Sequence, residues 1–150
     1  MPHKRLIRKL RIYGIHGEVL SWIEVFLLCR QQLVLCDGFK SEYSAVTSGV
    51  PQGTVLGPLL FLLHINDLPS VVDPGTSVRL FADDTLIYRV IHSLEDQVAL
   101  QRDLARLEQW AESWGMVFNA SKCHIMHVSR SSSSHQYLSC ISSVVLFCRR

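Results

Sequence analysis

The stretch SVRLFADDTLIYRV, residues 77–90, decides the fold of this chain. Apolar and β-branched residues dominate on both sides of the adjacent pair Asp83 and Asp84, a pattern that predicts two antiparallel strands joined by a tight turn. Aspartate is a common turn residue because its carboxylate bonds to nearby backbone. Two adjacent carboxylates also repel each other unless one is protonated or a cation is bound. The pair therefore has two interpretations, a simple turn or a metal site.

The metal interpretation points to a definite chemistry. Hard oxygen ligands at a partly open site suit Mg²⁺, which takes one or two carboxylates together with substrate phosphates. Such ligands are typical of phosphoryl or nucleotidyl transfer, in which two metal ions about 3.5–4 Å apart stabilise the attacking and leaving oxygens. A site of this kind needs a third carboxylate from elsewhere in the chain.

The segment before the hairpin predicts helices and one further turn. Residues 3–12 and 18–30 each carry an apolar stripe at helical spacing. The pair Asp37-Gly38 lies between short apolar runs, the usual pattern of a two-residue β-turn.

Two longer helices flank the hairpin. Residues 54–65 are apolar on nearly every side, which predicts a buried helix whose first turn holds Pro58. After the hairpin, Ser93 is a good N-cap and Gly115 a good C-terminal stop for an amphipathic helix. Residues 116–129 then alternate as a strand pair would. The predicted fold class is α+β, with an antiparallel sheet that has helices on one face.

The totals describe a globular chain. Of the 150 residues, 48% are hydrophobic and 19% charged, and the net charge of +2 does not by itself indicate nucleic acid. The five cysteines are scattered without a C-x-x-C motif, which predicts a reducing compartment. No signal peptide is recognised, and the apolar run 55–63 is shorter than the roughly 20 residues of a membrane span. We expect an intracellular protein of cytoplasm or nucleus, neither secreted nor in a membrane.

Cations gather in the first predicted helix. A run of like charges is usually a solvated helix face. It can also contact nucleic-acid phosphates, so the helix offers a weak backbone-binding site. The candidate phosphate contacts are Lys4, Arg5, Arg8 and Lys9.

A loop rich in glycine precedes the apolar helix. Glycines permit close approach of the backbone to a ligand, and the Gln52 amide can hydrogen-bond in two directions. The same residues also fit an ordinary turn that caps a buried helix, so both interpretations stay open. The candidate ligand-binding residues of the loop are Ser48, Gly49, Pro51, Gln52 and Gly53.

Three segments in one order carry a family resemblance. SGVPQGTVLGPLLFLLHINDLP, then LFADDTLIY, then LARLEQWAESWGMVFNASKCHIMHVS resemble the palm of reverse transcriptases from non-LTR (LINE-type) retrotransposons. The resemblance covers residues 48–129, and HKRLIRKLRIYGI with SWIEVFL is similar to the helical segment before the palm in that family. The chain is thus identified as a partial reverse transcriptase palm over residues 1–129, followed at 130–150 by a Ser-rich linker and a divergent apolar tail.

The resemblance implies a role for several residues. Asp83 and Asp84 would be the acidic pair that binds Mg²⁺ or Mn²⁺, with Phe81 and Ala82 before it. The loop would lie near the template and the incoming nucleotide. Lys122 would stabilise or protonate the leaving pyrophosphate, although an exposed strand lysine is an equally good interpretation. The implied activity is RNA-directed DNA synthesis, with an RNA template, a DNA primer and deoxynucleotides as partners and substrates.

The resemblance also implies a gap. The family carries a further metal-binding aspartate on a strand upstream of the region that matches residues 2–10, and this chain begins at Met1. We therefore expect an incomplete two-metal site, an uncovered sheet edge and apolar face, and no efficient polymerisation by this chain alone. A complementing retroelement polypeptide would have to supply the missing strand.

Other readings of the sequence stay open. The chain would in one of them be a non-catalytic remnant that binds RNA weakly through its first helix, or that has no function. In another, Cys123, His124 and His127 would hold zinc, although a strand places His124 on the other face. Trp110 and Trp114 are expected to be packing anchors of the long helix.

Overall fold

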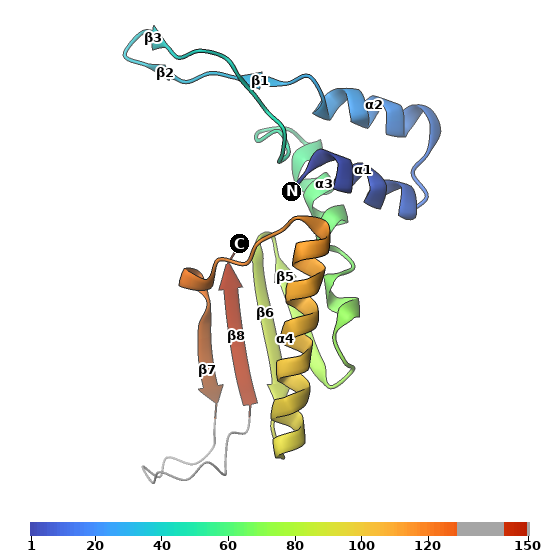
Figure 1. Cartoon of the computed structure of the whole chain (residues 1–150), viewed down its shortest axis with the longest axis vertical. Helices are drawn as coiled ribbons and strands as arrows, with labels where there is room; N and C mark the ends of the chain where they lie inside the picture. Colours follow the sequence, from blue (N-terminus) through green and yellow to red (C-terminus); the bar gives the residue numbers. More distant parts are fainter. Residues whose placement is uncertain (129–142, 150) are drawn as a thin grey trace. The chain divides into compact units, whose positions relative to one another are not determined.

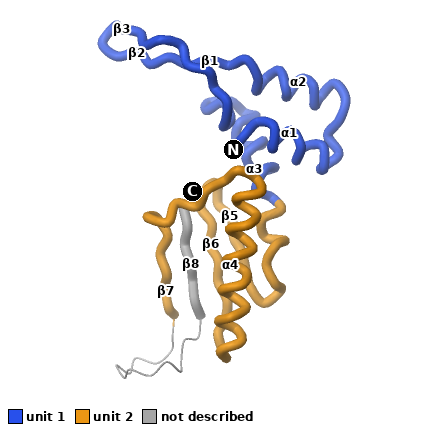
Figure 2. Tube along the Cα trace, in the orientation of Figure 1, with its two compact units in different colours: residues 1–66 blue, residues 67–150 orange. Residues whose placement is uncertain are grey.

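The computed structural model describes residues 1–128 and 143–149. By its internal contacts the chain divides into two compact units, Met1–Asn66 and Asp67–Arg150 (Figure 2). Each unit is described by itself below. The boundary that the sequence predicts, a palm over residues 1–129 and a tail after it, is a different kind of division and stays a prediction.

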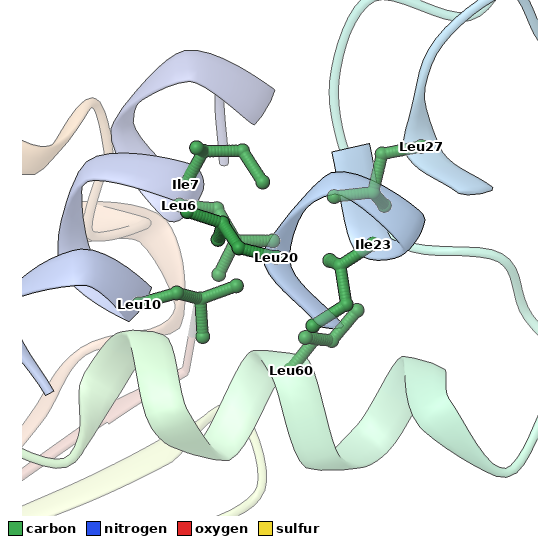
Figure 3. Close-up of a cluster of buried hydrophobic side chains, with 7 residues drawn as sticks. All are labelled: Leu6, Ile7, Leu10, Leu20, Ile23, Leu27 and Leu60. Carbon is green, nitrogen blue, oxygen red and sulfur yellow. The ribbon is translucent and has the colours of Figure 1, made fainter. Parts of the chain in front are cut away.

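Three helices form the core of the first unit. They are α1 (His3–Ile12), α2 (Gly17–Leu27) and α3 (Leu56–Ile65) (Figure 1). Each contributes apolar side chains to one buried cluster, which excludes water from the space between the helices (Figure 3). Its members are Leu6, Ile7, Leu10, Leu20, Ile23, Leu27 and Leu60.

The helices of this unit follow the sequence pattern closely. α1 has the predicted bounds, and α3 holds Pro58 in its first turn as expected. α2 ends at Leu27, three residues before the predicted end at Arg30, because Leu28 is extended and Cys29 takes a left-handed φ of 56°. The chain thereby turns out of the helix toward its next strand.

The prediction that α3 is buried on every side is wrong for the described structure. Leu60 and Ile65 are buried, whereas Leu59 and Leu62 are about half exposed, at 51% and 50%. The reason is that α1 packs against α3 and covers only part of its circumference. An apolar sequence shows which side chains can be buried, and neighbouring elements decide which of them are.

Short strands complete the first unit. β1 (Gln31–Gln32) pairs with β4 (Ser44–Ala45), and β2 (Leu35–Cys36) pairs with β3 (Phe39–Lys40). The turn between β2 and β3 is the predicted one. Asp37 and Gly38 both have positive φ, 49° and 84°, as a two-residue type I′ turn requires.

The second unit is a sheet with one long helix on it. The sheet has the order β5-β6-β8-β7 and is antiparallel throughout. Its strands are β5 (Thr76–Phe81), β6 (Asp84–Val90), β7 (His124–Val128) and β8 (Ser143–Arg149), and the short 3-10 helices η1 (Leu68–Val71) and η2 (Ala120–Lys122) precede β5 and β7. The helix α4 (Leu94–Trp114) lies along one face of the sheet (Figure 1). The predicted α+β class, an antiparallel sheet with its helix on one face, describes this unit.

The caps of α4 are those that the sequence predicts. The Ser93 hydroxyl accepts a hydrogen bond from the Asp96 N–H, and the Asp96 carboxylate accepts from the Ser93 N–H, which makes a capping box. At the other end Gly115 has a φ of 66°, in the left-handed region that glycine adopts without strain. Both ends are therefore fixed by local chemistry.

A buried carboxylate joins α4 to the start of β5. Asp103 is fully buried, and its oxygens accept hydrogen bonds from the Thr76 hydroxyl (2.6 Å) and the Asp73 N–H (3.0 Å). Arg106 donates to Asp103 over 3.1 Å and forms an ion pair with the Asp73 carboxylate. A buried charge is tolerated only when it is paired and hydrogen-bonded, and Asp103 meets both conditions.

One expectation about the second unit is wrong. Residues 116–128 contain η2 and the single strand β7, not a strand pair, because the Asn119 side chain accepts from the Ser121 N–H (3.1 Å) and turns the chain. β8 pairs with β6 along its whole length and separates it from β7. The outer strands of the described sheet are thus β5 and β7, and the sheet edge expected from a missing strand stays a prediction. The predicted linker lies mostly in residues 129–142, outside the described part of the chain.

Candidate functional site

The acidic pair lies at the closed end of the β5–β6 hairpin. Phe81 and Asp84 are the last cross-strand pair, so Ala82 and Asp83 form the turn. Asp83 is exposed, and Asp84 is half-buried as the first residue of β6. The pair thus lies at the hairpin tip, as expected, but only one of the two carboxylates belongs to the turn itself.

The backbone of this turn is strained at one residue. Ala82 has a φ of 51°, a region that residues with a Cβ avoid at a cost of about 1–2 kcal/mol. The first central residue of a two-residue hairpin turn often needs a positive φ, and glycine is the usual choice there. Strained residues of this kind cluster at functional sites.

The pleat of the sheet determines which face Asp84 occupies. Cross-strand partners share a face, and Val78 with its partner Ile87 are both buried on the face that α4 covers. Since side chains alternate along a strand, Asp84 lies on the opposite face together with Leu86 and Tyr88. No helix among the described residues of this unit covers that face. Within the described part of this unit, Asp84 thus lies on the face opposite α4.

Lys122 is at the same end of the sheet as the acidic pair. β7 begins at His124, which pairs with residue 147 of β8, and Asp84 pairs with residue 149 of the same strand. Lys122, in η2 just before β7, is exposed. Its expected contact with a pyrophosphate beside Asp84 stays a prediction.

The acidic pair has the donor chemistry of a Mg²⁺ ligand. Asp83 and Asp84 offer carboxylate oxygens at an open end of the sheet, which is sufficient for Mg²⁺ that keeps waters or phosphate oxygens as its other ligands. Among the described residues no group of three or more His, Cys, Asp or Glu side chains is placed to hold a metal. The metal role of Asp83 and Asp84 and the expected gap in the site therefore stay predictions. Zinc at Cys123 has no support in the same part of the chain, where the Cys123 thiol donates to the Asn119 carbonyl (3.3 Å).

The glycine-rich loop lies in the first unit, between β4 and α3. Ser48, Gln52 and Gly53 are exposed, Gly49 is half-buried and Pro51 is buried. Thr54 fixes the second half of the loop, since its hydroxyl donates to the Pro51 carbonyl (2.8 Å) and accepts from the Gly57 N–H (3.1 Å).

Gly57 is a residue that the sequence reasoning missed. A Cβ on it would lie 2.5 Å from the Pro51 carbonyl oxygen. The first turn of α3 therefore packs directly against the backbone of the loop, where only glycine fits. Its position one turn after the loop, beside Pro58, was the available signal.

The cations of α1 differ in exposure and in their partners. Lys4 and Arg8, four residues apart on one helix face, are exposed, and Arg11 is exposed but forms an ion pair with Glu24 (2.9 Å). Arg5 is half-buried. Lys9 is only 1% exposed.

The assignment of Lys9 to phosphate binding is therefore corrected. Its ammonium donates to the His64 carbonyl (2.5 Å), in the last turn of α3. Charge favours this position, because the C-terminal end of a helix carries partial negative charge and unpaired carbonyls. The interaction explains how a lysine can lie in the core of the unit.

The tryptophans of α4 behave as packing anchors. Trp110 is buried, and its indole N–H donates to the Asp67 carboxylate (3.2 Å). Trp114 is half-buried near the C-terminal end of the helix. In the described residues, no helix is long and apolar enough to cross a membrane.

Comparison with known proteins finds one matching family model and several similar curated proteins. Residues 1–141 match the family model described as reverse transcriptase (RNA-dependent DNA polymerase). The RNA-directed DNA polymerase from mobile element jockey of Drosophila melanogaster is 36% identical over 108 residues, 67% of this chain and 12% of the relative. The probable RNA-directed DNA polymerase from transposon BS of the same species is 37% identical over 123 residues, 77% of this chain and 13% of the relative.

A third relative matches a shorter part of the chain. The probable RNA-directed DNA polymerase from transposon X-element of Drosophila melanogaster is 40% identical over 81 residues, 51% of this chain and 9% of the relative. The chain thus spans about an eighth or less of the length of these curated relatives. No solved structure matches it.

Proposed function

The chain belongs to the reverse transcriptase (RNA-dependent DNA polymerase) family of non-LTR retrotransposons, and from this premise we propose that it is the part of such a polymerase that holds the acidic pair of the palm. The parent reaction is template-directed transfer of a deoxynucleotide to a primer end. The observation that carries the proposal is the position of Asp83 and Asp84 at the tip of the β5–β6 hairpin, with Lys122 at the same end of the sheet.

The proposed reaction assigns a step to each group. The primer 3′-hydroxyl oxygen forms a bond to the α-phosphorus of the nucleotide, the bond to the pyrophosphate breaks, and the hydroxyl proton passes to solvent water. The carboxylates of Asp83 and Asp84 would hold a Mg²⁺ ion, which would supply charge stabilisation to the oxygens of this step. The ammonium of Lys122 donates a proton to the departing pyrophosphate.

In this proposal the exposed residues near the pair receive the primer end. Phe81 is 82% exposed at the end of β5, next to Ala82 in the turn, and can pack against a sugar or base. The loop around Gln52 contacts the template and the incoming nucleotide. RNA template, DNA primer and deoxynucleotides are thus the partners proposed for the complete polymerase.

We further propose that the chain alone does not polymerise efficiently. Catalysis of phosphoryl transfer depends almost wholly on positioning and electrostatics, and two carboxylates position one ion loosely. Primer extension on an RNA template with Mg²⁺ or Mn²⁺ tests this directly. Processive synthesis by the purified chain that Asp83→Asn/Asp84→Asn abolishes would overturn the proposed inactivity and establish the polymerase.

Metal binding tests the role proposed for Asp83 and Asp84. We expect calorimetric titration with Mn²⁺ to show weak binding that the Asp83→Asn/Asp84→Asn variant loses. A Glu18→Gln/Glu24→Gln variant, which removes two carboxylates of α2, should bind as the wild type does. Equal binding by all three proteins, or no binding by any, would contradict the metal role of the pair.

A non-catalytic RNA-binding role is the second candidate, and the exposed face of α1 favours it. Lys4 and Arg8 form a pair of cations four residues apart, whereas Lys9 is buried and Arg11 is paired. Two phosphate contacts to a single strand give a salt slope of only about −1.4, so the binding would be weak.

Salt-dependent binding of a single-stranded RNA tests this candidate. Lys4→Gln/Arg8→Gln should remove most of the salt dependence, and Lys40→Gln on the exposed strand β3 is the control for loss of a single cation. Binding that is unchanged by the double substitution excludes α1 as the RNA contact.

A further inference from the structure

The first residues of the chain hold the first half of the glycine-rich loop. The His3 imidazole is hydrogen-bonded through Nε2 to the Gly49 carbonyl (2.9 Å), and the Gly49 N–H donates to the Met1 carbonyl (2.9 Å). Pro2 and Ser48 form an isolated antiparallel bridge at the same place. The two segments are 46 residues apart in sequence at the His3 contact, so they are joined by the fold and not by proximity along the chain.

The carbonyl partner determines which ring nitrogen of His3 carries a hydrogen. A carbonyl oxygen can only accept, so Nε2 carries the hydrogen of this bond. His3 is 6% exposed and Gly49 is half-buried, so the bond is partly shielded from competition with water. The contact therefore ties the start of α1 to one defined backbone group of the loop.

The second half of the loop is held from the other side. The Thr54 hydroxyl donates to the Pro51 carbonyl, and Gly57 leaves no room for a Cβ beside the same oxygen. Gln52, exposed, lies between the two fixed points. Gly49 and Gly53, with φ of 82° and 76°, supply the two bends that this path requires.

The contact is more specific than helix packing alone requires. α1 and α3 already share the buried cluster with α2, and the His3 bond adds nothing to that apolar contact. It acts instead on the backbone of Gly49, at the start of the loop. Binding sites gain affinity when a loop is held in its bound conformation before the ligand arrives.

We propose that His3 is a positioning residue, which fixes the Gly49 carbonyl and thereby the backbone of residues 48–53 for contact with template and incoming nucleotide. This inference rests on the proposed function of the loop. His3 itself does not contact the substrate. Its role is to keep Gln52 presented on a loop that is ordered before binding.

Amide hydrogen exchange of the full chain tests the positioning step. His3→Leu removes the donor at similar volume, His3→Gln keeps an N–H near the Nε2 position, and His16→Leu replaces an exposed histidine that makes no side-chain cap bond. We expect His3→Leu to raise exchange at the loop amides by about tenfold, the loss of roughly one buried hydrogen bond, with less change in the helical amides of α3. His3→Gln should recover most of the protection, and His16→Leu should match the wild type.

Two exchange results would overturn the positioning role. Loop amides that exchange in His3→Leu as they do in His16→Leu would show that the bond does not hold the loop. Equal loss of protection across α1, α3 and the loop would show that His3 only stabilises the unit.

Binding of a fluorescent RNA–DNA template–primer with a deoxynucleotide, on the same variants, separates the two proposals. Weaker binding by His3→Leu that His3→Gln recovers supports the inference, and equal binding by the wild type and His3→Leu overturns it. If the wild type does not bind, the proposed ligand role of the loop fails for this chain, and with it the purpose assigned to His3, whatever the exchange data show about the bond.

Discussion

At the scale of single residues, Gly57 shows two opposing effects whose magnitudes can be compared. Alanine is favoured over glycine in a helix by about 1 kcal/mol. A Cβ at this position would lie 2.5 Å from the Pro51 carbonyl oxygen, a backbone atom that cannot rotate away. Overpacking of this kind costs about 1–3 kcal/mol, so the steric effect should dominate.

We therefore predict that Gly57→Ala lowers the free energy of unfolding by about 1 kcal/mol, the difference between these two effects. Urea denaturation measures it. Ser113→Gly in the exposed C-terminal part of α4 is a control for helix propensity alone. An increase in stability for Gly57→Ala would mean that the loop moves away from α3 at little cost.

Ala82 in the hairpin turn gives a second prediction at this scale. Its φ of 51° is easier for glycine and harder for a β-branched residue. We expect Ala82→Val to destabilise the chain by about 1 kcal/mol or more, and Ala82→Gly to be neutral or slightly stabilising, because relief of strain and the extra freedom of the unfolded chain nearly cancel. Thermal unfolding of the wild type and the two variants gives the order of their stabilities. A higher melting temperature for Ala82→Val than for Ala82→Gly would contradict the strained turn.

At the scale of elements, α4 is attached to the sheet by ion pairs that respond to pH. The hydrogen bond from Arg106 lowers the pKa of Asp73. The pKa of Asp96 is lowered by the hydrogen bond from the His92 backbone N–H and, to a smaller extent, by the hydrogen bond from the Arg89 side chain. A carboxyl whose pKa is lower in the folded state stabilises the fold above its unfolded pKa of about 3.9. That stability is lost as the pH falls through the folded pKa.

We predict that the free energy of unfolding is steady from neutral pH down to about 5 and then falls below the unfolded pKa of aspartate. Asp73→Asn and Asp96→Asn should each reduce this acid dependence, whereas Glu95→Gln, exposed in the same first turn, should not. Urea unfolding at a series of pH values measures the slope. A slope unchanged in both aspartate variants would remove these two groups as its cause.

At the scale of the whole chain, the pairing of β8 with β6 decides what lies beside the acidic pair. Residue 149 is the cross-strand partner of Asp84, although the two are far apart in sequence. The backbone neighbour of the acidic pair on this side is therefore a strand from the far end of the described chain, and no residue close to the pair in sequence.

Short-range patterns in the sequence are sufficient to predict the local elements and the family. Residues 3–12, the Asp37-Gly38 turn, the hairpin around Asp83 and the caps at Ser93 and Gly115 have the predicted positions. Each depends on periodicity, turn geometry or capping, which act among residues a few positions apart. The acidic pair was recognised for the same reason, as a motif within one hairpin.

The tertiary structure alone decided the rest, because it depends on partners distant in the chain. Lys9 has the sequence environment of an exposed cation, and only the end of α3 makes it a buried donor. His3 has no local signal, and its partner Gly49 is 46 residues away. The same holds for β8, which no pattern near residues 143–149 assigns to the place between β6 and β7. Local physics selects the elements, and long-range packing selects which of their residues can act.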